Sequence, residues 1–508
     1  MKRKIVIMLV ALILVLVSCK PAALSPLEIS PINGHQTIVT NSVTTSSTTS
    51  VLTLTPSQTS GSTSTTTVVQ TTTPTITSTP GSPTTQPPTT SITAFNFSSV
   101  LFGRSSSLGA SVQTIDRTLG NVVVNGGDTR QPTIPFTFDW GDGKVTNTFF
   151  PGTHTYSDTN KNYVITVTAH YSDGTTDSVQ FAALFNTPTI KPISLPDDIK
   201  VTIPSSPVLL ESRMPGYKPS SNLTVFNDSC FTIIPRSTVE YILTVAASIQ
   251  KDFANDDVYL VNGGFNQVVL SDPNFGGMYS LWFTSPVSFG AGNYAFQGTP
   301  QWSSFFHEMG HNITLNSPAN YYFGGKIDGS ANAIFSESMA QIFQHATALY
   351  LINNYQTYGL SEDLVLEIKD SALSSMQLVK NSYESYLSNG KHFSSWNDPS
   401  TSQDDTFGTF VTIAYKFFEH AEKSPLGYQT SLKRMMRLLQ LFDENMAAKY
   451  DPKSNTETGA VFRSTLMVTA LSYAFEQDLR PEFRDLNFPI DDQVYDELFQ
   501  KASFLPPQ

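Results

Sequence analysis

The sequence predicts a multidomain protein in which a small β-sandwich precedes an α+β domain with a mainly helical C-terminal part. Three observations support this prediction. Residues 29–103 of the 508 contain no Asp, Glu, Lys or Arg. Short runs of alternating apolar and polar residues, separated by Gly-containing turns, follow in residues 95–190. Longer helical periods and most of the charged residues lie in 191–508.

Net charge and cysteine count argue against three kinds of protein. The net charge is −12, which argues against a nucleic-acid-binding protein, because such proteins depend on cationic side chains. The chain has 2 cysteines, too few for a disulfide scaffold or a four-cysteine zinc site. We interpret Cys230 as a small buried apolar residue, since no Cys/His arrangement surrounds it.

Residues 1–18 have the pattern of a signal peptide. Basic residues at positions 2–4 precede an apolar run at 5–17, which is short for a membrane span. The run ends in Leu16-Val17-Ser18-Cys19 and resembles the lipobox of bacterial lipoproteins. The resemblance implies lipidation of Cys19 and attachment to the cell membrane, facing the extracellular side or the cell envelope. An ordinary secretory signal with a coincidental Cys is the alternative.

Residues 19–94 are expected to form a disordered tether. Between positions 41 and 93, 33 of 53 residues are Ser or Thr. Such a segment cannot bury enough apolar surface to offset the entropy lost on ordering. It would hold the folded parts away from the membrane.

Residues 95–190 contain motifs of a known β module. Three motifs follow one another: Phe138-Asp139-Trp140-Gly141-Asp142-Gly143, His154-Thr155-Tyr156 and Tyr163-Val164-Ile165-Thr166-Val167. Their order resembles that of a PKD (polycystic-kidney-disease) domain. Such a module serves as a spacer or adhesive unit.

The polar residues of this module have a structural interpretation. Asp139 and Asp142 could bind a metal, but a hydrogen-bonded turn in front of a buried Trp140 is favoured. His154 and His170 are expected to be structural or exposed.

The segment from Thr299 to Asn312 contains the candidate metal-binding and catalytic residues. Thr299 could cap a helix, with Pro300 in its first turn. His307 and His311 would then project from one face, one turn apart, where two imidazoles can share a metal ion. Glu308 would lie beside that metal. This is the HExxH arrangement of zinc metallopeptidases.

A catalytic zinc also needs a third protein ligand. Thr314 and Ser317 occupy the positions where a metzincin would have Gly and His, which excludes that class. Glu337 is the favoured ligand, on a helix expected over residues 331–351 with its core stripe at Phe335, Met339, Ile342, Ala346 and Leu349. His345, on the same face as Glu337 and Gln341, and Asp328 are the alternatives.

His307-Glu308-x-x-His311 with a downstream helical Glu337 resembles the gluzincin metallopeptidases. Gly310 and the spacing to Glu337 also fit the HExGH…Glu pattern of the enhancin-like, mucin-targeting subgroup. The resemblance implies a β lobe, an active-site helix and a helical lower lobe in residues 191–508. Gln341 departs from the thermolysin-like pattern, which has Asp there, so the partner of His307 and the subfamily stay open.

The resemblance implies an extracellular zinc peptidase that binds one zinc per chain and hydrolyses proteins, peptides or glycoproteins. Zinc would lower the pKa of a bound water, and Glu308 would act as the general base. Tyr415 is a candidate oxyanion donor, although a core tyrosine is equally consistent. The alternative function is a cell-envelope adhesin or glycan-binding protein with an inactive metallopeptidase-like domain.

Overall fold

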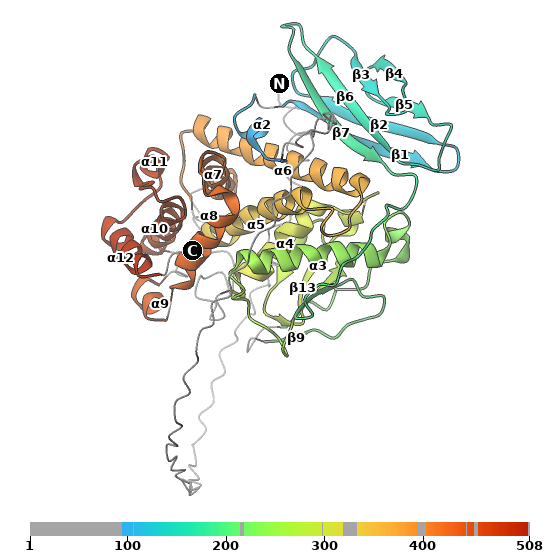
Figure 1. Ribbon diagram of the computed structural model, residues 1–508. Coiled ribbons are helices and arrows are strands. Elements are labelled where there is room, and N and C mark those ends of the chain that lie inside the picture. The colour runs from blue at the N-terminus through green and yellow to red at the C-terminus, as the bar shows by residue number, and fades with distance from the viewer. Residues whose placement is uncertain are drawn as a thin grey trace, which may run out of the picture. The chain divides into compact units, whose positions relative to one another are not determined.

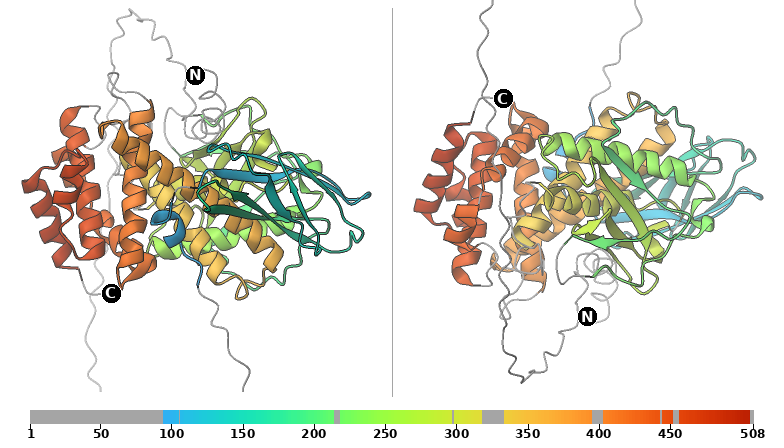
Figure 2. Two further views of the ribbon diagram at one scale, coloured as in Figure 1. Left: turned by 90° about the horizontal axis from the view of Figure 1, so that it is seen from above. Right: turned by 90° about the horizontal axis from the view of Figure 1, so that it is seen from below.

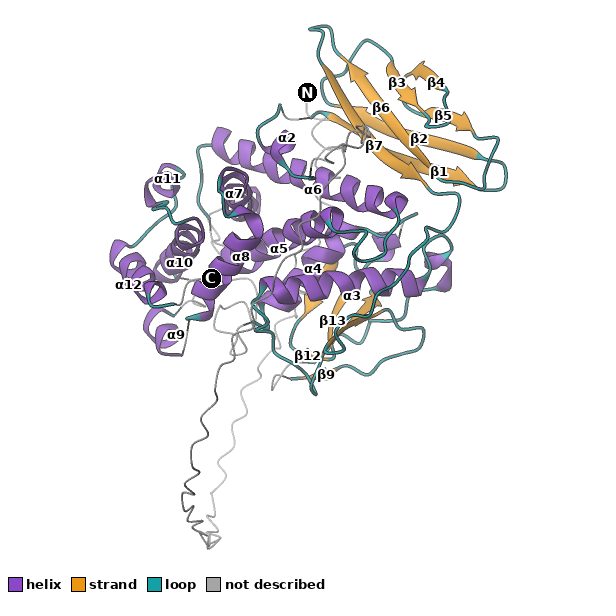
Figure 3. Cartoon of the chain, viewed as in Figure 1, coloured by secondary structure: helices purple, strands orange, loops and turns teal. Residues whose placement is uncertain are grey.

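The computed structural model describes residues 94–104, 106–213, 218–296, 298–317, 333–394, 403–442, 444–451 and 456–505. The signal peptide, Cys19 and almost all of the tether predicted from the sequence lie outside these residues. The described chain mixes α and β structure, with sheets in its N-terminal and middle parts and helices toward its C-terminus (Figures 1 and 3). Within these ranges, no helix combines the length and the apolar character needed to cross a membrane.

The first part is a sandwich of two antiparallel sheets. One has the order β1-β2-β5, and the other has the order β4-β3-β6-β7. Inward residues of both sheets, among them Val124, Phe138 and Ile165, share one core. The strands are β1 (Leu108–Asp116), β2 (Asn121–Asp128), β3 (Phe136–Asp139), β4 (Val145–Thr148), β5 (Gly152–Thr155), β6 (Tyr163–His170) and β7 (Thr176–Ala183), after a short helix α2 (Ser98–Leu101).

The polar motif after β3 forms a turn. The backbone N–H of Gly141 donates to Asp139 at 3.0 Å, and Trp140 is fully buried. The ring of His154 stacks on Trp140, and its Nε2 lies 3.0 Å from Asp142 Oδ2. These contacts confirm the structural interpretation of the aspartates and of His154.

The second part is built on a four-stranded sheet with the order β11-β13-β10-β8. β10 is parallel to both neighbours, whereas β11 is antiparallel and lies at the edge. The strands are β8 (Ile199–Thr202), β10 (Phe265–Ser271), β11 (Met278–Leu281) and β13 (Val287–Ala291), and β9 (Glu211–Ser212) pairs with β12 (Thr284–Ser285).

Helices account for most of the chain after the sheet. Their apolar side chains form one continuous core with the inner face of the sheet. In both views of Figure 2, the C-terminal helices (orange to red) gather together. The helices are α3 (Arg236–Phe253), α4 (Trp302–Thr314), α5 (Ala333–Asn353), α6 (Glu362–Ser388), α7 (Gln403–Lys423), α8 (Gly427–Gln440), α9 (Glu444–Tyr450), α10 (Glu457–Phe475), α11 (Arg480–Asp485) and α12 (Asp492–Ser503), and short 3₁₀ turns are η2 (Asp228–Phe231) and η3 (Asn293–Phe296).

The expected start of α4 is wrong by a few residues. The helix begins at Trp302, with Gln301 as its N-cap and no side-chain cap. The hydroxyl of Thr299 instead donates to Glu367 Oε2 of α6 at 2.8 Å. The hydroxyl of Thr299, which the local sequence predicts to cap α4, therefore bonds to a carboxylate far away in the sequence.

Candidate metal centre

α4 is buried along most of its length, and both of its histidines are buried. Its residues from Phe305 to Thr314 are all buried. His307 and His311 are one helical turn apart, and their Nε2 atoms approach to 3.1 Å. Two ring nitrogens therefore converge on one point.

A glycine allows the second helix to come close enough to complete the group. A Cβ on Gly310 would lie 3.2 Å from Ala340 Cα, 3.2 Å from the carbonyl oxygen of Ala340 and 3.2 Å from Phe343 Cβ of α5. This close packing brings Glu337, in the first two turns of α5, toward the histidines. Its Oε2 lies 3.3 Å from His307 Nε2 and 3.4 Å from His311 Nε2.

The three atoms have the spacing of a metal-binding group. His307, His311 and Glu337 are the one such group in the described residues. Ligands bound at about 2.0–2.1 Å to one tetrahedral ion lie about 3.3–3.4 Å from each other. The observed separations of 3.1, 3.3 and 3.4 Å lie within about 0.3 Å of this value. The residues therefore fit a small divalent metal ion.

The surroundings orient the ligands. Ser336 Oγ lies 3.0 Å from His311 Nδ1, the ring nitrogen on the far side from the cluster. Such partners fix the orientation of ligand histidines. Burial would raise the pKa of Glu337, but the charges and hydrogen bonds of His311 and His307 hold that pKa well below its usual range. The carboxylate form, which binds metal, is thereby favoured.

Glu308 lies outside the ligand group but beside it. Its side chain is 1% exposed, and Ser280 Oγ of β11 lies 3.0 Å from its Oε2. Burial raises the pKa of Glu308 to about 8, opposed by the charge of His307 and increased by that of Glu337. Such a carboxyl group can exchange a proton near neutral pH.

The other candidate ligands are not part of the group. His345 is not in the group formed by His307, His311 and Glu337. Its ring is fully buried and makes edge contacts with Phe97 and Phe418 at 5.6 and 5.7 Å between centroids. Its Nδ1 lies 2.8 Å from the carbonyl oxygen of Gln341. Asp328 lies outside the described residues.

Tyr415 has a place in the core instead of at the cluster. Its hydroxyl donates to the carbonyl oxygen of Leu101 at 3.1 Å, and its ring stacks on Tyr383 with centroids 4.1 Å apart. It does not line the cavity that contains His307 and Glu308. The structure therefore favours the core interpretation that the sequence left open.

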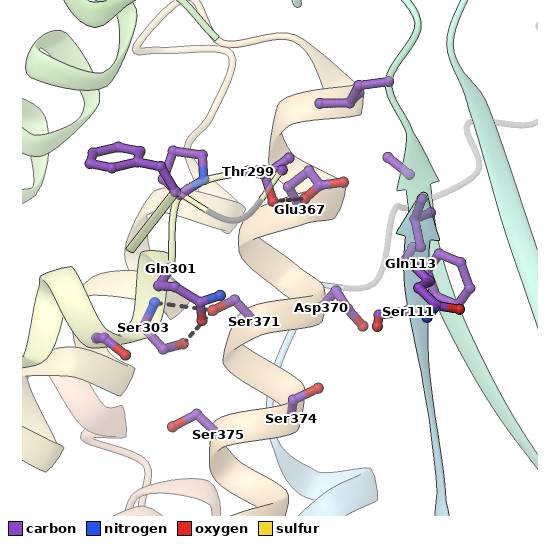
Figure 4. Close-up of a pocket in the computed structure, with 18 of the residues that line it drawn as sticks. Ser111, Gln113, Thr299, Gln301, Ser303, Glu367, Asp370, Ser371, Ser374 and Ser375 are labelled. Carbon is purple, nitrogen blue, oxygen red and sulfur yellow. Dashed lines mark hydrogen bonds between the residues drawn. The ribbon is translucent and has the colours of Figure 1, made fainter. Parts of the chain in front are cut away.

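A cavity of about 1140 Å³ opens beside the metal group. His307, Glu308 and Gln341 line it, together with residues of α6 and of β1 in the sandwich. Figure 4 shows the α6 wall, with Glu367, Asp370 and a row of serines. Glu308 is therefore part of the wall of a large cavity.

Cys230 also lines this cavity and is only partly buried. We expected Cys230 to be buried, and it is only half-buried, although its side chain does pack against the core. Burial raises the pKa of its thiol, which disfavours the nucleophilic thiolate form.

Two residues of the site were not identified from the sequence. Ser280 contacts Glu308 from a strand 28 residues away, and Ser336 contacts His311 across 25 residues. Serine is common on protein surfaces and in turns, so neither position has a distinctive local pattern. Ser336 is next to Glu337 in the sequence, and only this position could have pointed to a role for it in the site.

Comparisons with known proteins give no family. No protein family and no curated protein matches the sequence. Among solved structures, the chain is similar to a functionally unknown conserved protein from Bacillus anthracis str. Ames, solved as a mutant. The match has 11% identity and a TM-score of 0.32 and covers 78% of this chain and 73% of that one. A likeness of this level does not establish a shared fold, and the function must be inferred from the site.

Proposed function

We propose that the protein is an extracellular zinc-dependent peptidase of the gluzincin type. The observation that carries this proposal is the convergence of His307, His311 and Glu337 at separations of 3.1–3.4 Å, with Glu308 adjoining them in a cavity. The donor set of two imidazoles and one carboxylate is that of catalytic zinc in peptidases, which leaves one position for water or substrate.

The side chains have separate roles in this proposal. Zinc, when bound, supplies a Lewis acid that polarises the peptide carbonyl and lowers the pKa of water. Glu308 takes the proton of the attacking water and delivers it to the leaving amine. Ser280 holds one carboxylate oxygen of Glu308, which leaves Oε1 without a hydrogen-bond partner among the described residues. That oxygen is the one available to the water.

The N-terminal assignments belong to the same proposal. Cys19 carries a lipid that anchors the protein to the cell membrane, and the PKD-like sandwich is a spacer or part of the substrate cleft. The Cys19→Ala variant should leave the membrane fraction or remain as an unprocessed precursor. Unchanged partitioning together with unchanged precursor size would contradict lipidation.

The enzymatic proposal is tested by cleavage of a broad peptide library. The purified protein should cleave peptides, lose activity with a chelator and regain it with zinc. The Glu308→Gln variant preserves the shape of the side chain but removes the base. It should keep its zinc and lose activity by about 10²–10⁴-fold, the usual contribution of a general base.

Glu362→Gln is the matched control, because Glu362 is exposed in the first turn of α6, outside the cavity. It should cleave as the wild type does. Undiminished cleavage by Glu308→Gln would contradict the mechanism. A wild-type protein with neither zinc nor activity would favour the adhesin.

A further inference from the structure

One wall of the cavity is an acidic stretch of α6. Glu367 and Asp370 are three residues apart on this helix and therefore share a face. Both line the same cavity as His307 and Glu308. Figure 4 shows Asp370 directed away from α6 toward Ser111 of β1, across the cavity.

Hydrogen bonds define where this stretch lies relative to the metal group. Thr299 bonds to Glu367, and four residues later on both segments Ser303 bonds to Ser371, with Oγ atoms 2.8 Å apart. The two segments therefore run side by side in the same direction. His307 lies one turn beyond Ser303, so Glu367 is about two turns from it, or roughly 12 Å.

Among the described residues, no Lys or Arg side chain forms an ion pair with Glu367 or Asp370. Glu367 accepts hydrogen bonds from Thr299 and from the backbone N–H of Ala182. In the described part of the chain, no hydrogen bond or ion pair reaches Asp370. Arg117 is the one Lys or Arg side chain among the residues that line the cavity, and it donates to the carbonyl oxygen of Leu184.

The electrostatics agree with this geometry. Burial raises the pKa of Glu367 to about 7. Burial and the charge of Glu367 raise the pKa of Asp370 to about 8. A cation placed between the two carboxyl groups would relieve this repulsion and favour their ionised forms.

Two further residues of the cavity wall each carry a buried acceptor without a partner among the described residues. Gln341 is 6% exposed and Glu308 is 1% exposed, and Oε1 of each accepts no hydrogen bond from the described residues. Both side chains line the cavity. Buried acceptors in native proteins are nearly always bonded, so these atoms indicate a ligand that brings donors.

We propose that Asp370, supported by Glu367, receives a basic side chain of the substrate and makes the enzyme selective for peptides with Lys or Arg near the cleaved bond. This inference rests on the proposed peptidase function. Asp370 lies three residues further along α6 than Glu367, so it is roughly 8 Å from the level of His307 along the helices. An extended peptide advances about 3.3 Å per residue, which places the basic residue about two positions from that bond.

The kinetic test compares peptides that differ at one position. Each position of a cleaved peptide is fixed in turn as Lys or as Gln, with the N-terminus free or acetylated. The wild type should prefer Lys over Gln by at least tenfold in kcat/KM at one position, mainly through KM, with either N-terminus. Asp370→Asn should reduce this ratio to near one, and Glu367→Gln should reduce it in part.

Glu362→Gln, an exposed position on the same helix, should retain the full ratio. Charge reversal gives a result that misfolding cannot mimic, since Asp370→Lys should prefer Glu over Lys at that position. A wild type without a Lys preference, or an Asp370→Asn variant that retains it, would overturn the proposal. A preference that disappears on acetylation would assign the site to a terminal amine and would also overturn it.

A binding measurement separates this inference from the peptidase proposal. The Glu308→Gln variant is titrated with fluorescent Lys and Gln peptides, and the Lys peptide should bind at least tenfold more tightly. Adding Asp370→Asn should remove the difference. Selective binding without any cleavage by the wild type would refute the peptidase and keep the cationic site. Cleavage with equal binding of the two peptides would refute the cationic site and keep the peptidase.

Discussion

Helix α5 carries two buried titratable side chains eight residues apart, Glu337 and His345, and their surroundings differ. Glu337 meets two imidazole nitrogens at 3.3 and 3.4 Å. His345 is enclosed by aromatic rings, and its Nδ1 contacts the backbone of its own helix. Burial of a histidine is therefore not sufficient for a ligand, and convergence of several donor atoms is what distinguishes the site.

The protonation states of Glu337 and His345 also differ. The histidines hold the pKa of Glu337 below its usual range, which keeps it charged. Burial lowers the pKa of His345 to about 4, which keeps it neutral. The surroundings of Glu337 stabilise a charged side chain, whereas those of His345 stabilise a neutral one. The following variants test this difference.

The largest expected effect concerns His345. With a pKa of about 4 in the folded state and about 6.5 in the unfolded state, the unfolded state binds more protons between these values. His345 therefore lowers the free energy of unfolding as the pH falls from about 6.5 to 4, by about 3 kcal/mol in all. His345→Leu should remove this part of the acid sensitivity.

The measurement is urea unfolding at several pH values, with a chelator present so that metal release does not contribute. His392→Gln, at an exposed position, should keep the acid sensitivity of the wild type. Parallel pH curves for the wild type and His345→Leu would show that His345 is not a neutral core residue.

The next effect concerns the partner of His311. Ser336→Ala should weaken metal binding about 10–100-fold, as expected for loss of a group that orients a ligand. Ser338→Ala is a matched control, because Ser338 is buried on the same helix but donates to Phe410 of α7. Competition titration against a metal-binding dye gives both affinities. Equal affinities would mean that Ser336 does not support the site.

The smallest effect concerns the partner of Glu308. The single hydroxyl hydrogen of Ser280 is shared between the backbone carbonyl oxygen of Glu308 at 2.7 Å and Glu308 Oε2 at 3.0 Å. Ser280→Ala removes this interaction, which is worth about 1 kcal/mol, or roughly fivefold in rate if it acts on the transition state. We expect kcat to fall by this amount while the metal content stays complete. A loss of metal in this variant would place Ser280 in the support of the ligands and not of the base.

The sequence predicted the parts of the site that depend on local spacing. A separation of four residues places His307 and His311 on one face in any helix. The apolar stripe of α5 predicted the helix that carries Glu337, and all five stripe residues are buried. The runs of alternating apolar and polar residues within 95–190 likewise predicted short strands, and β6 is one of them, with burial that alternates along its length.

The remaining parts depend on contacts between distant segments. Thr299 looked like a helix cap, but its hydroxyl bonds to Glu367, 68 residues later. His345 was an alternative ligand, but in the folded chain its ring packs against Phe97, which precedes α2, and Phe418 of α7. Such contacts are set by tertiary packing, which local periodicity does not encode.

The most direct test of the account is the metal content of three purified proteins, measured by mass spectrometry after dialysis. The wild type and His345→Ala should each contain one zinc per chain. Glu337→Ala should contain far less, because two imidazoles alone make an incomplete site. Full zinc in Glu337→Ala together with loss of zinc in His345→Ala would contradict the account and reassign the third ligand.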